Sequence, residues 1–442
     1  MKVSKLAGWA TGLALVALAT TADADPFGGR NNGTNFEGAV YAMANGFNGN
    51  SIVAYGRRAD GTLKLLGEYA TGGDGAAFDG GEGLDPLISA YAILLTENRR
   101  HLLVVNAGSS SVSVFRVRDD LSLRLTDTAY VQGVGPNSIA YRDGLVYVST
   151  IDADGVFAGE PDQEGALSGF RLTPGGRLRP IRNSVRYLDN RPSAVQFSPD
   201  GRFLVVSSIN AGSAALASGS TDEIVVYGVG RNGRLTGRPL DGATSTLPFN
   251  AENRNLPSAI GFEIVEDEGE QFVVVTEARE FQADGTPPAF PALQAGSVST
   301  WRLEKHGQLT PINLDVLTGT SQSDGERTTC WIEFSADGNT FWVSNALEAT
   351  LSTFSFYRGE IDLLERAEVS GIPASDDDPF GTTDGWIDLW ISDDGEYVYQ
   401  LYGLSGTIGV FKVDDEGTGT GLTLIQEVSD LPEINTQGIV AF

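Results

Sequence analysis

The chain has 442 residues, with 58 Asp and Glu against 30 Lys and Arg, which gives a formal net charge of −28. Such an acidic surface repels nucleic acid and anionic lipid, so we expect no nucleic-acid partner and no membrane partner. Cys330 is the single cysteine, and the chain therefore folds without an intramolecular disulfide. Its stability has to come from the burial of apolar side chains.

The first residues have the pattern of an export signal. Two lysines precede an apolar run over residues 6–19, and Ala22-Asp23-Ala24 fits an A-x-A cleavage site. The run is too short and too interrupted by Gly and Thr for a membrane span, so the pattern predicts a signal peptide over residues 1–24. We expect a secreted or periplasmic protein. Residues 25–37 are rich in Gly and Asn and predict a flexible lead-in.

One four-stranded unit recurs from residue 38 onward. Its clearest copy starts with PSAVQFSPDGRFLVVSS at residues 192–208, where a Ser-Pro-Asp-Gly turn separates two apolar strands. EIVVYGVGRNGRL, at residues 223–235, adds an alternating strand, an Asn-Gly turn and the start of a fourth strand. IEFSADGNTFWVSNA, at residues 332–346, repeats the first half of the unit. Seven such units predict an all-β fold, a seven-bladed β-propeller.

The two ends of the repeat region complement each other. The first unit, which begins with GAVYAMAN at residues 38–45, lacks the innermost strand of the later units. A strand that matches it, QGIVAF, stands at residues 437–442. We expect this strand to pair with blade 1 and close the ring, which removes two sheet edges. Residues 38–442 then form a single domain, and we expect a monomer.

The lengths of the connections predict where a site lies. Turns between the first and second strands, and between the third and fourth, are short, whereas the other connections are long. Alternate connections of a meander emerge on the same face, so one face carries the long loops and, we expect, the site. Asp152, Asn210 and Glu277 are predicted on that face. His101 and His306 are predicted in short turns on the opposite face, away from any chemistry.

Several segments resemble a known group of proteins. They are DPL at residues 85–87, NAGSSSVSVFRV at 106–117, VVVTEA at 273–278 and CWIEFSADG at 330–338. The chain resembles the secreted seven-bladed lactonase-like propellers, the 3-carboxymuconate cyclase or 6-phosphogluconolactonase-like proteins. That resemblance implies a lactonase- or cyclase-like enzyme acting on a small acidic or aromatic-derived lactone. It also implies an Arg-His pair, which this sequence lacks, and a Glu, for which Glu277 is the counterpart.

The resemblance and the strand pattern together suggest a set of site residues. Glu277, at the end of a Val-rich strand, is the predicted catalytic base, and Arg279 or Arg254 would hold an anionic substrate. Trp331 and Trp386 would stack on the substrate, with Asp388 as a further binding group. Two structural alternatives stay open: Glu277 accepts hydrogen bonds from its own loop, and the Trp side chains pack between blades.

Other chemistries find little support in the sequence. Cys330 has no His nearby and is expected to be a buried small side chain. We expect no cofactor and no metal in the catalytic site, although the acidic loops at 152–155 and 376–378 could offer oxygen ligands to a structural Ca²⁺. The alternative to an enzyme is a non-catalytic secreted propeller that binds carbohydrate, peptide or protein through its long-loop face.

Overall fold

The computed structural model describes residues 36–76, 85–152, 165–209, 223–240, 244–246, 256–281, 294–321, 324–367, 385–413 and 421–442. These residues all belong to one compact unit, Phe36–Phe442. The predicted signal peptide and almost all of the predicted lead-in lie outside the described residues. In the part of the chain that is described, all regular structure is β. Accordingly, this part contains no helix with the length and apolarity of a membrane span.

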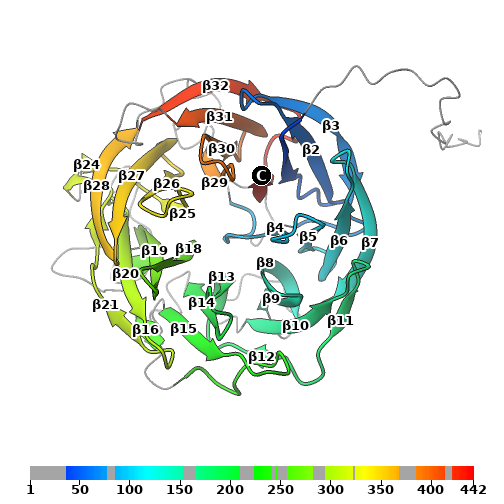
Figure 1. Cartoon of the computed structure of the whole chain (residues 1–442), viewed down its shortest axis with the longest axis horizontal. Coiled ribbons are helices and arrows are strands. Elements are labelled where there is room, and N and C mark those ends of the chain that lie inside the picture. Colours follow the sequence, from blue (N-terminus) through cyan, green and yellow to red (C-terminus); the bar gives the residue numbers. More distant parts are fainter. Residues whose placement is uncertain are drawn as a thin grey trace, which may run out of the picture. The chain divides into compact units, whose positions relative to one another are not determined.

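Seven antiparallel sheets stand radially around a common axis, as the sequence predicts (Figure 1). The first blade comprises β1 (Gly38–Met43), β2 (Ser51–Arg57), β3 (Leu63–Ala70) and β33 (Ile439–Ala441). The second comprises β4 (Ile93–Leu95), β5 (His101–Asn106), β6 (Ser111–Val117) and β7 (Leu123–Tyr130). The third comprises β8 (Val134–Arg142), β9 (Leu145–Asp152), β10 (Ala166–Leu172), β11 (Leu178–Pro180) and β12 (Arg186–Tyr187).

The remaining four blades follow in chain order. The fourth comprises β13 (Arg191–Phe197), β14 (Phe203–Ile209), β15 (Glu223–Gly228) and β16 (Thr244–Thr246). The fifth comprises β17 (Leu256–Ser258), β18 (Phe262–Asp267), β19 (Glu270–Phe281), β20 (Ser297–Leu303), β21 (Leu309–Pro311) and β22 (Val316–Leu317). A hairpin of β23 (Gly319–Ser321) and β24 (Asp324–Gly325) precedes the sixth blade. The sixth comprises β25 (Thr329–Phe334), β26 (Thr340–Asn345), β27 (Thr350–Tyr357) and β28 (Glu360–Ala367). The seventh comprises β29 (Trp386–Ile391), β30 (Tyr397–Tyr402), β31 (Thr407–Val413) and β32 (Leu422–Val428).

The position of a strand within its blade explains its sequence. The second strands, such as β5 and β14, are buried at every position, because a neighbouring blade covers each face of the sheet. They therefore have nearly continuous apolar runs. The outermost strand β32 instead alternates between half-buried and exposed residues, which matches its alternating sequence LTLIQEV. The core thus lies between the blades and is divided among several clusters of apolar side chains.

The short turns repeat one hydrogen-bonding device. In the fourth blade, Ser198 Oγ donates to Asp200 Oδ1 at 2.7 Å, and the backbone N–H of Arg202 donates to the same oxygen at 3.0 Å. Gly201 has a φ of 68°, which a side chain would strain. The Ser-x-Asp-Gly sequences at 335–338 and 392–395 form the same turn.

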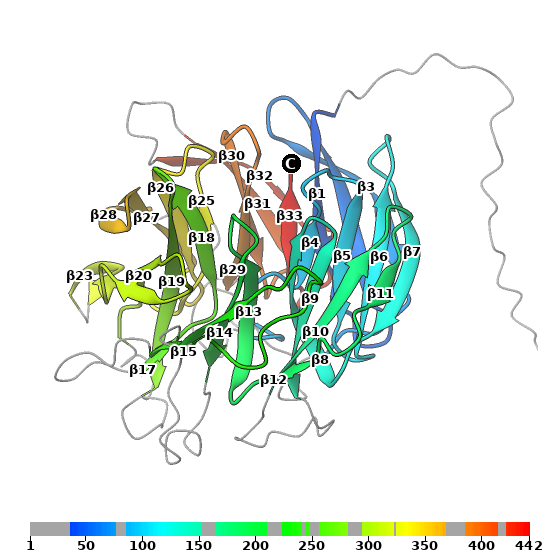
Figure 2. The ribbon, with the colours of Figure 1, turned by 60° about the horizontal axis from the view of Figure 1, so that its bottom comes forward.

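The C-terminal strand closes the ring, which confirms the prediction. β33 pairs antiparallel with β1, with Tyr41 opposite Val440, and stands beside it in Figure 2. The pairing is extended by Phe442 N–H, which donates to the carbonyl of Ala39 at 3.0 Å. Arg57, a buried residue of β2, donates from Nε to the carbonyl of Phe442 at 3.3 Å. Blade 1 therefore combines three strands from the start of the described chain with one from its end.

An irregular stretch before β4, residues 85–92, runs across the axis and is called the axial segment below. Ser89 Oγ donates to the carbonyl of Asn137 in the third blade at 2.9 Å, and Ala90 N–H donates to Ser193 of the fourth at 3.3 Å. Tyr91 reaches the fifth blade, where its hydroxyl donates to the carbonyl of Phe262 at 2.6 Å. Ile88 and Tyr91 both have positive φ, 45° and 64°, which is unusual for bulky side chains. Contacts to several blades hold this strained backbone in place.

Candidate functional site

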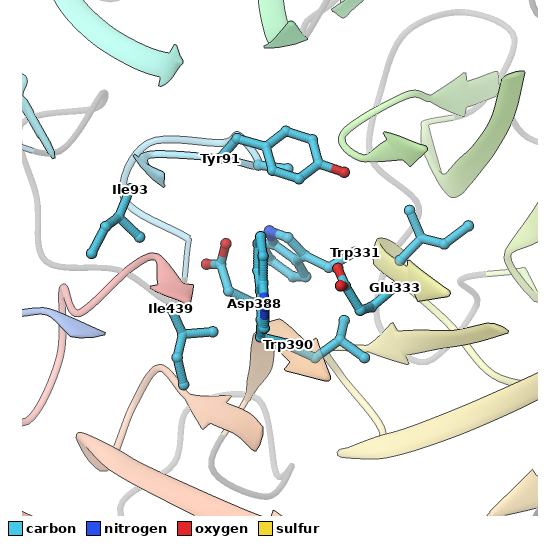
Figure 3. Close-up of a pocket in the computed structure, with 10 residues that line it drawn as sticks. Tyr91, Ile93, Trp331, Glu333, Asp388, Trp390 and Ile439 are labelled. Atoms are coloured by element: carbon cyan, nitrogen blue, oxygen red, sulfur yellow. The ribbon is translucent and has the colours of Figure 1, made fainter. Parts of the chain in front are cut away.

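The axial segment and the innermost strands of the sixth and seventh blades enclose a cavity on the propeller axis (Figure 3). The space between the lining atoms amounts to about 300 Å³, a figure that includes open solvent at its mouth. Its lining combines aromatic rings, aliphatic groups and two carboxyl groups. The lining residues are Ala90, Tyr91, Ile93, Trp331, Ile332, Glu333, Asp388, Leu389, Trp390 and Ile439.

Asp388, in β29, is the buried carboxyl group of this cavity, with 5% of its surface exposed. The backbone N–H of Gly438 donates to its Oδ2 at 3.0 Å and is the contact between this group and the C-terminal strand. Burial disfavours the carboxylate more than this hydrogen bond favours it, and raises the pKa of Asp388 to about 7. Near neutral pH the group can therefore both accept and release a proton.

Glu333 and Glu263 form a second acidic group beside Tyr91. The Tyr91 hydroxyl lies 2.6 Å from the carbonyl of Phe262 and 2.9 Å from Glu263 Oε1, yet it has only one proton to donate. The carbonyl and the Glu263 carboxyl group therefore compete for that proton. Burial raises the pKa of Glu263 to about 7, and burial together with the charge of Glu263 raises that of Glu333.

Two indole rings form the aromatic wall of the cavity. Trp331 is buried, and its Nε1 donates to the carbonyl of Ser89 at 3.0 Å, which fixes both the ring and the axial segment. Trp390 is half-buried and lies on the next blade. Figure 3 shows the carboxyl groups of Asp388 and Glu333 on either side of these rings, with the phenol ring of Tyr91 across the cavity.

The half-buried members of the cavity indicate which end is open. Glu333 and Trp390 each lie two residues before a short turn, and both keep part of their surface accessible. Trp331 and Asp388 lie nearer the starts of the same strands and are buried. Among the described residues, the cavity is therefore accessible from the face of the short turns. The sequence had instead placed the site on the long-loop face.

Glu277 and Arg279 lie in a different place, at the long-loop end of β19. Both side chains are fully buried, and Arg279 Nη2 donates to Glu277 Oε2 at 2.6 Å and to Asp315 Oδ1 at 2.9 Å. Ser297 Oγ also donates to Glu277 Oε2, at 2.6 Å. Arg279 thus binds the protein's own carboxylates. This arrangement resembles the structural alternative for Glu277, and a catalytic role for the pair stays a prediction.

The other predicted site residues divide between the cavity and the core. Trp331 and Asp388 are brought together at the cavity, as expected for ligand-binding groups. Trp386 packs inside the seventh blade, where its ring stacks on Tyr402 with centroids 5.1 Å apart. Arg254, Asn210 and most of the two acidic loops considered for Ca²⁺ lie outside the described residues. Within the described part of the chain, no group of three His, Cys, Asp or Glu side chains could hold a metal ion.

A register shift explains why Trp386 departs from its neighbours. Alternation alone would place Trp386, Asp388 and Trp390 on one side of β29. The pairing of β29 with β30 is irregular between Trp386 and Leu389, however, and such a bulge changes the direction of the side chains before it. Asp388 and Trp390 therefore line the cavity, and Trp386 does not.

Three residues of the site were not predicted: Tyr91, Glu263 and Glu333. Alternation could have found Glu333, because it follows Trp331 by two residues in the same innermost strand. Tyr91 gave no such signal, since it lies in an irregular segment whose path is set by contacts with distant blades.

Comparison with known proteins supports the fold. The family model described as "Lactonase, 7-bladed beta-propeller" matches residues 279–432, which confirms the resemblance to lactonase-like propellers over that part of the chain. No curated protein matches the sequence.

Solved structures cover more of the chain. A Bacteroides fragilis protein named as a candidate 6-phosphogluconolactonase is 16% identical, with a TM-score of 0.59 over 92% of this chain and 98% of its own. A periplasmic gluconolactonase of Pseudomonas aeruginosa is 18% identical, with a TM-score of 0.52 over 74% and 82%. A hypothetical selenium-binding protein of Sulfolobus tokodaii is 14% identical, with a TM-score of 0.63 over 92% and 94%. At these identities the likeness is one of fold.

Proposed function

We propose that this lactonase-like propeller hydrolyses a small lactone in its axial cavity, with Asp388 as the general base. One observation carries the proposal: a buried carboxyl group whose pKa is raised to about 7 lines the cavity on the propeller axis. A catalytic base works best when its pKa lies near the working pH. The family-model match supports the reaction class.

The reaction requires two proton transfers. The Asp388 carboxylate would take a proton from water as the water oxygen bonds to the lactone carbonyl carbon. The bond between that carbon and the ring oxygen then breaks, and the ring oxygen takes up a proton, leaving a hydroxy acid. Asp388, protonated in the first step, would then return this proton to the ring oxygen, which restores its carboxylate. The indole faces of Trp331 and Trp390 would position the ring between the two carboxyl groups of the cavity.

Glu277 is the competing candidate, because it is the counterpart of the family's Glu. Its buried ion pair with Arg279 and its bond from Ser297 favour a fixed carboxylate. A base held in this way would have to break these contacts to reach a substrate. We therefore place the reaction at Asp388, and the same experiment can compare the two residues.

The test is hydrolysis of a panel of small lactones by the wild type, Asp388→Asn and Glu277→Gln. Loss of a general base typically lowers kcat by about 10²- to 10⁴-fold, and we expect this for Asp388→Asn. The wild-type rate should rise with pH through about 7, as Asp388 loses its proton, and the Asn variant should lack this rise. A loss confined to Glu277→Gln would move the reaction to the long-loop end of the fifth blade. Full activity in both variants would refute both assignments.

A non-catalytic binding propeller is the second candidate. The observation that favours it is the missing Arg-His pair, together with the burial of Glu277 in an internal ion pair. Absence of turnover on a broad lactone panel, combined with saturable binding of a ligand, would support this alternative. We further propose that the protein is exported to the periplasm or beyond, on the pattern of residues 1–24; the Pseudomonas protein of similar fold is named as periplasmic.

A further inference from the structure

The axial cavity concentrates acidic side chains. Asp388 and Glu333 line it, Glu263 lies within hydrogen-bonding distance of the lining residue Tyr91, and Asp85 of the axial segment is close enough to Asp388 for their charges to interact. These groups influence one another: the charge of Asp388 contributes to the raised pKa of Asp85, and the charges of Glu263, Glu333 and Asp388 contribute to that of Tyr91. The carboxyl groups are therefore close enough to repel one another when ionised.

Among the described residues, the lining of the cavity contains no matching positive charge. None of the described residues that line the cavity is Lys, Arg or His. Between residues 36 and 442, the segments outside the described ranges contain a single Lys or Arg, which is Arg254. Arg279, which the sequence analysis proposed to hold an anionic substrate, is already bound to Glu277 and Asp315. A compensating charge would therefore have to come from the ligand.

The walls of the cavity suit a particular kind of cation. The rings of Tyr91, Trp331 and Trp390 converge on the space between the carboxyl groups (Figure 3). Aromatic faces attract organic cations such as ammonium groups, and indole does so most strongly. A Ca²⁺ ion would instead need six to eight oxygen ligands, and the described residues contain no group of three acidic, His or Cys side chains that could hold a metal.

We propose that the axial cavity selects lactones that carry an ammonium group over neutral lactones of the same ring, and neutral lactones over anionic ones. This inference rests on the proposed function and specifies its substrate class. The ammonium group would lie against the indole of Trp390 and form an ion pair with the Glu333 carboxylate, whose ionised form it would favour. The lactone carbonyl would face Asp388. A carboxylate on the substrate would be repelled by Asp388 and Glu333 in their ionised forms. None of the described lining residues is a cation that could pair with it.

A set of ring-matched substrates tests the selection. γ-Butyrolactone, α-amino-γ-butyrolactone and γ-butyrolactone-γ-carboxylate share one ring and differ in charge. Just below neutral pH, where the amine is protonated, we expect kcat/KM to fall by about tenfold or more at each step from cation to neutral to anion. Added salt should narrow these differences, since it screens charges that are partly open to solvent. Equal kcat/KM for the three, or a preference for the anion, would overturn the inference and leave the lactonase proposal intact.

Variants connect the selection to named residues. Trp390→Leu should reduce the preference for the amino-lactone by removing an aromatic face. The matched control is Glu396→Gln, which removes an exposed carboxylate near the same face of the propeller and should leave the preference unchanged. If Glu396→Gln reduces the preference as much as Trp390→Leu, the general surface charge and not the cavity causes the selection, and the inference fails.

A binding experiment separates failure of the inference from failure of the proposed function. Calorimetric titration with methylammonium chloride needs no turnover, and sodium chloride is its control. Binding that is weakened by Trp390→Leu would support the cation site even if no lactone is hydrolysed. Absence of methylammonium binding, in a protein that hydrolyses the three lactones equally, would refute the cation site alone.

Discussion

Two groups of buried charges in this propeller are built in opposite ways. At the long-loop end of the fifth blade, Glu277, Arg279, Ser297 and Asp315 come from one blade and are joined to one another by hydrogen bonds, two of which go to Glu277 Oε2. On the axis, the acidic groups come from different blades, and no Lys, Arg or His is among the described lining residues. The first group contains a cation and is local, whereas the second has no cation among the described lining residues and is assembled over long distances in the sequence.

The difference shows which carboxyl groups are available for chemistry. A carboxylate that is held by a guanidinium and a hydroxyl is fixed in place by these bonds. A carboxyl group that is buried without a cation has its pKa raised toward neutrality and can exchange protons. Only the second condition describes Asp388, for which the pKa is raised to about 7. Resemblance to a family pointed to Glu277, while the electrostatics favour the axis.

The largest effect should come from removing the strand on which the axial group depends. In a variant that ends at Asn435, Asp388 loses its bond from Gly438, Ser89 loses its bond from Gln437, and two sheet edges become exposed. Three large buried apolar side chains are lost as well, those of Ile439, Val440 and Phe442, each worth about 1.5 to 3 kcal/mol. Chemical unfolding should show a stability loss comparable to that of a whole domain. An unchanged unfolding midpoint would contradict ring closure by β33.

Breaking the ion pair between Glu277 and Arg279 should also lower the free energy of unfolding. Arg279→Met leaves the buried Glu277 carboxylate without its cation, and removal of one partner of a buried pair typically costs about 3 to 5 kcal/mol. Urea unfolding of this variant, compared with the exposed control Arg118→Met, measures the effect. If the two variants lose the same stability, Glu277 and Arg279 are not the tight pair that the structure shows.

Replacing the axial carboxyl group of Asp388 by a neutral side chain should instead make the protein more stable than the wild type near neutral pH. The folded pKa of Asp388 is about 7 against an ordinary value of 3.8, so the folded state holds the proton more tightly than the unfolded state. The wild type should then lose stability between pH values of about 4 and 7, by up to about 4 kcal/mol. Asp388→Asn should lack this decline, and unfolding followed at several pH values would detect it. Parallel pH profiles would show that Asp388 titrates normally.

The smallest effect concerns the contact between Trp331 and the axial segment. Trp331→Phe removes the hydrogen bond to the carbonyl of Ser89, which typically contributes about 0.5 to 1.5 kcal/mol. Hydrogen exchange should quicken at the bonded amides of the axial segment, such as Ala90, and stay unchanged in the fifth blade. The matched variant Trp386→Phe, within the seventh blade, should leave exchange in the axial segment unaltered. Identical patterns in the two variants would argue against a specific role for Trp331.

The sequence determined the architecture because the propeller repeats one local pattern seven times. Apolar strands that end in Ser-x-Asp-Gly turns predict a four-stranded blade by short-range rules alone, and the missing strand of the first blade matched 437–442. Alternation along an innermost strand could likewise have placed Asp388 and Trp390 on the same side of β29. Errors began where a strand is irregular, as at Trp386, whose direction depends on a bulge.

Only the tertiary structure decided which of the many carboxyl groups are special. Glu277 and Asp388 look alike in the sequence, and each stands in a buried strand. Their difference comes from their partners in space. Arg279, which also binds Asp315, contacts Glu277, whereas Asp388 is contacted by the backbone N–H of Gly438, just before β33. Tyr91 reaches Glu263 across the axis from 172 residues away. Solvation and charge depend on such neighbours in space, and local sequence patterns do not contain them.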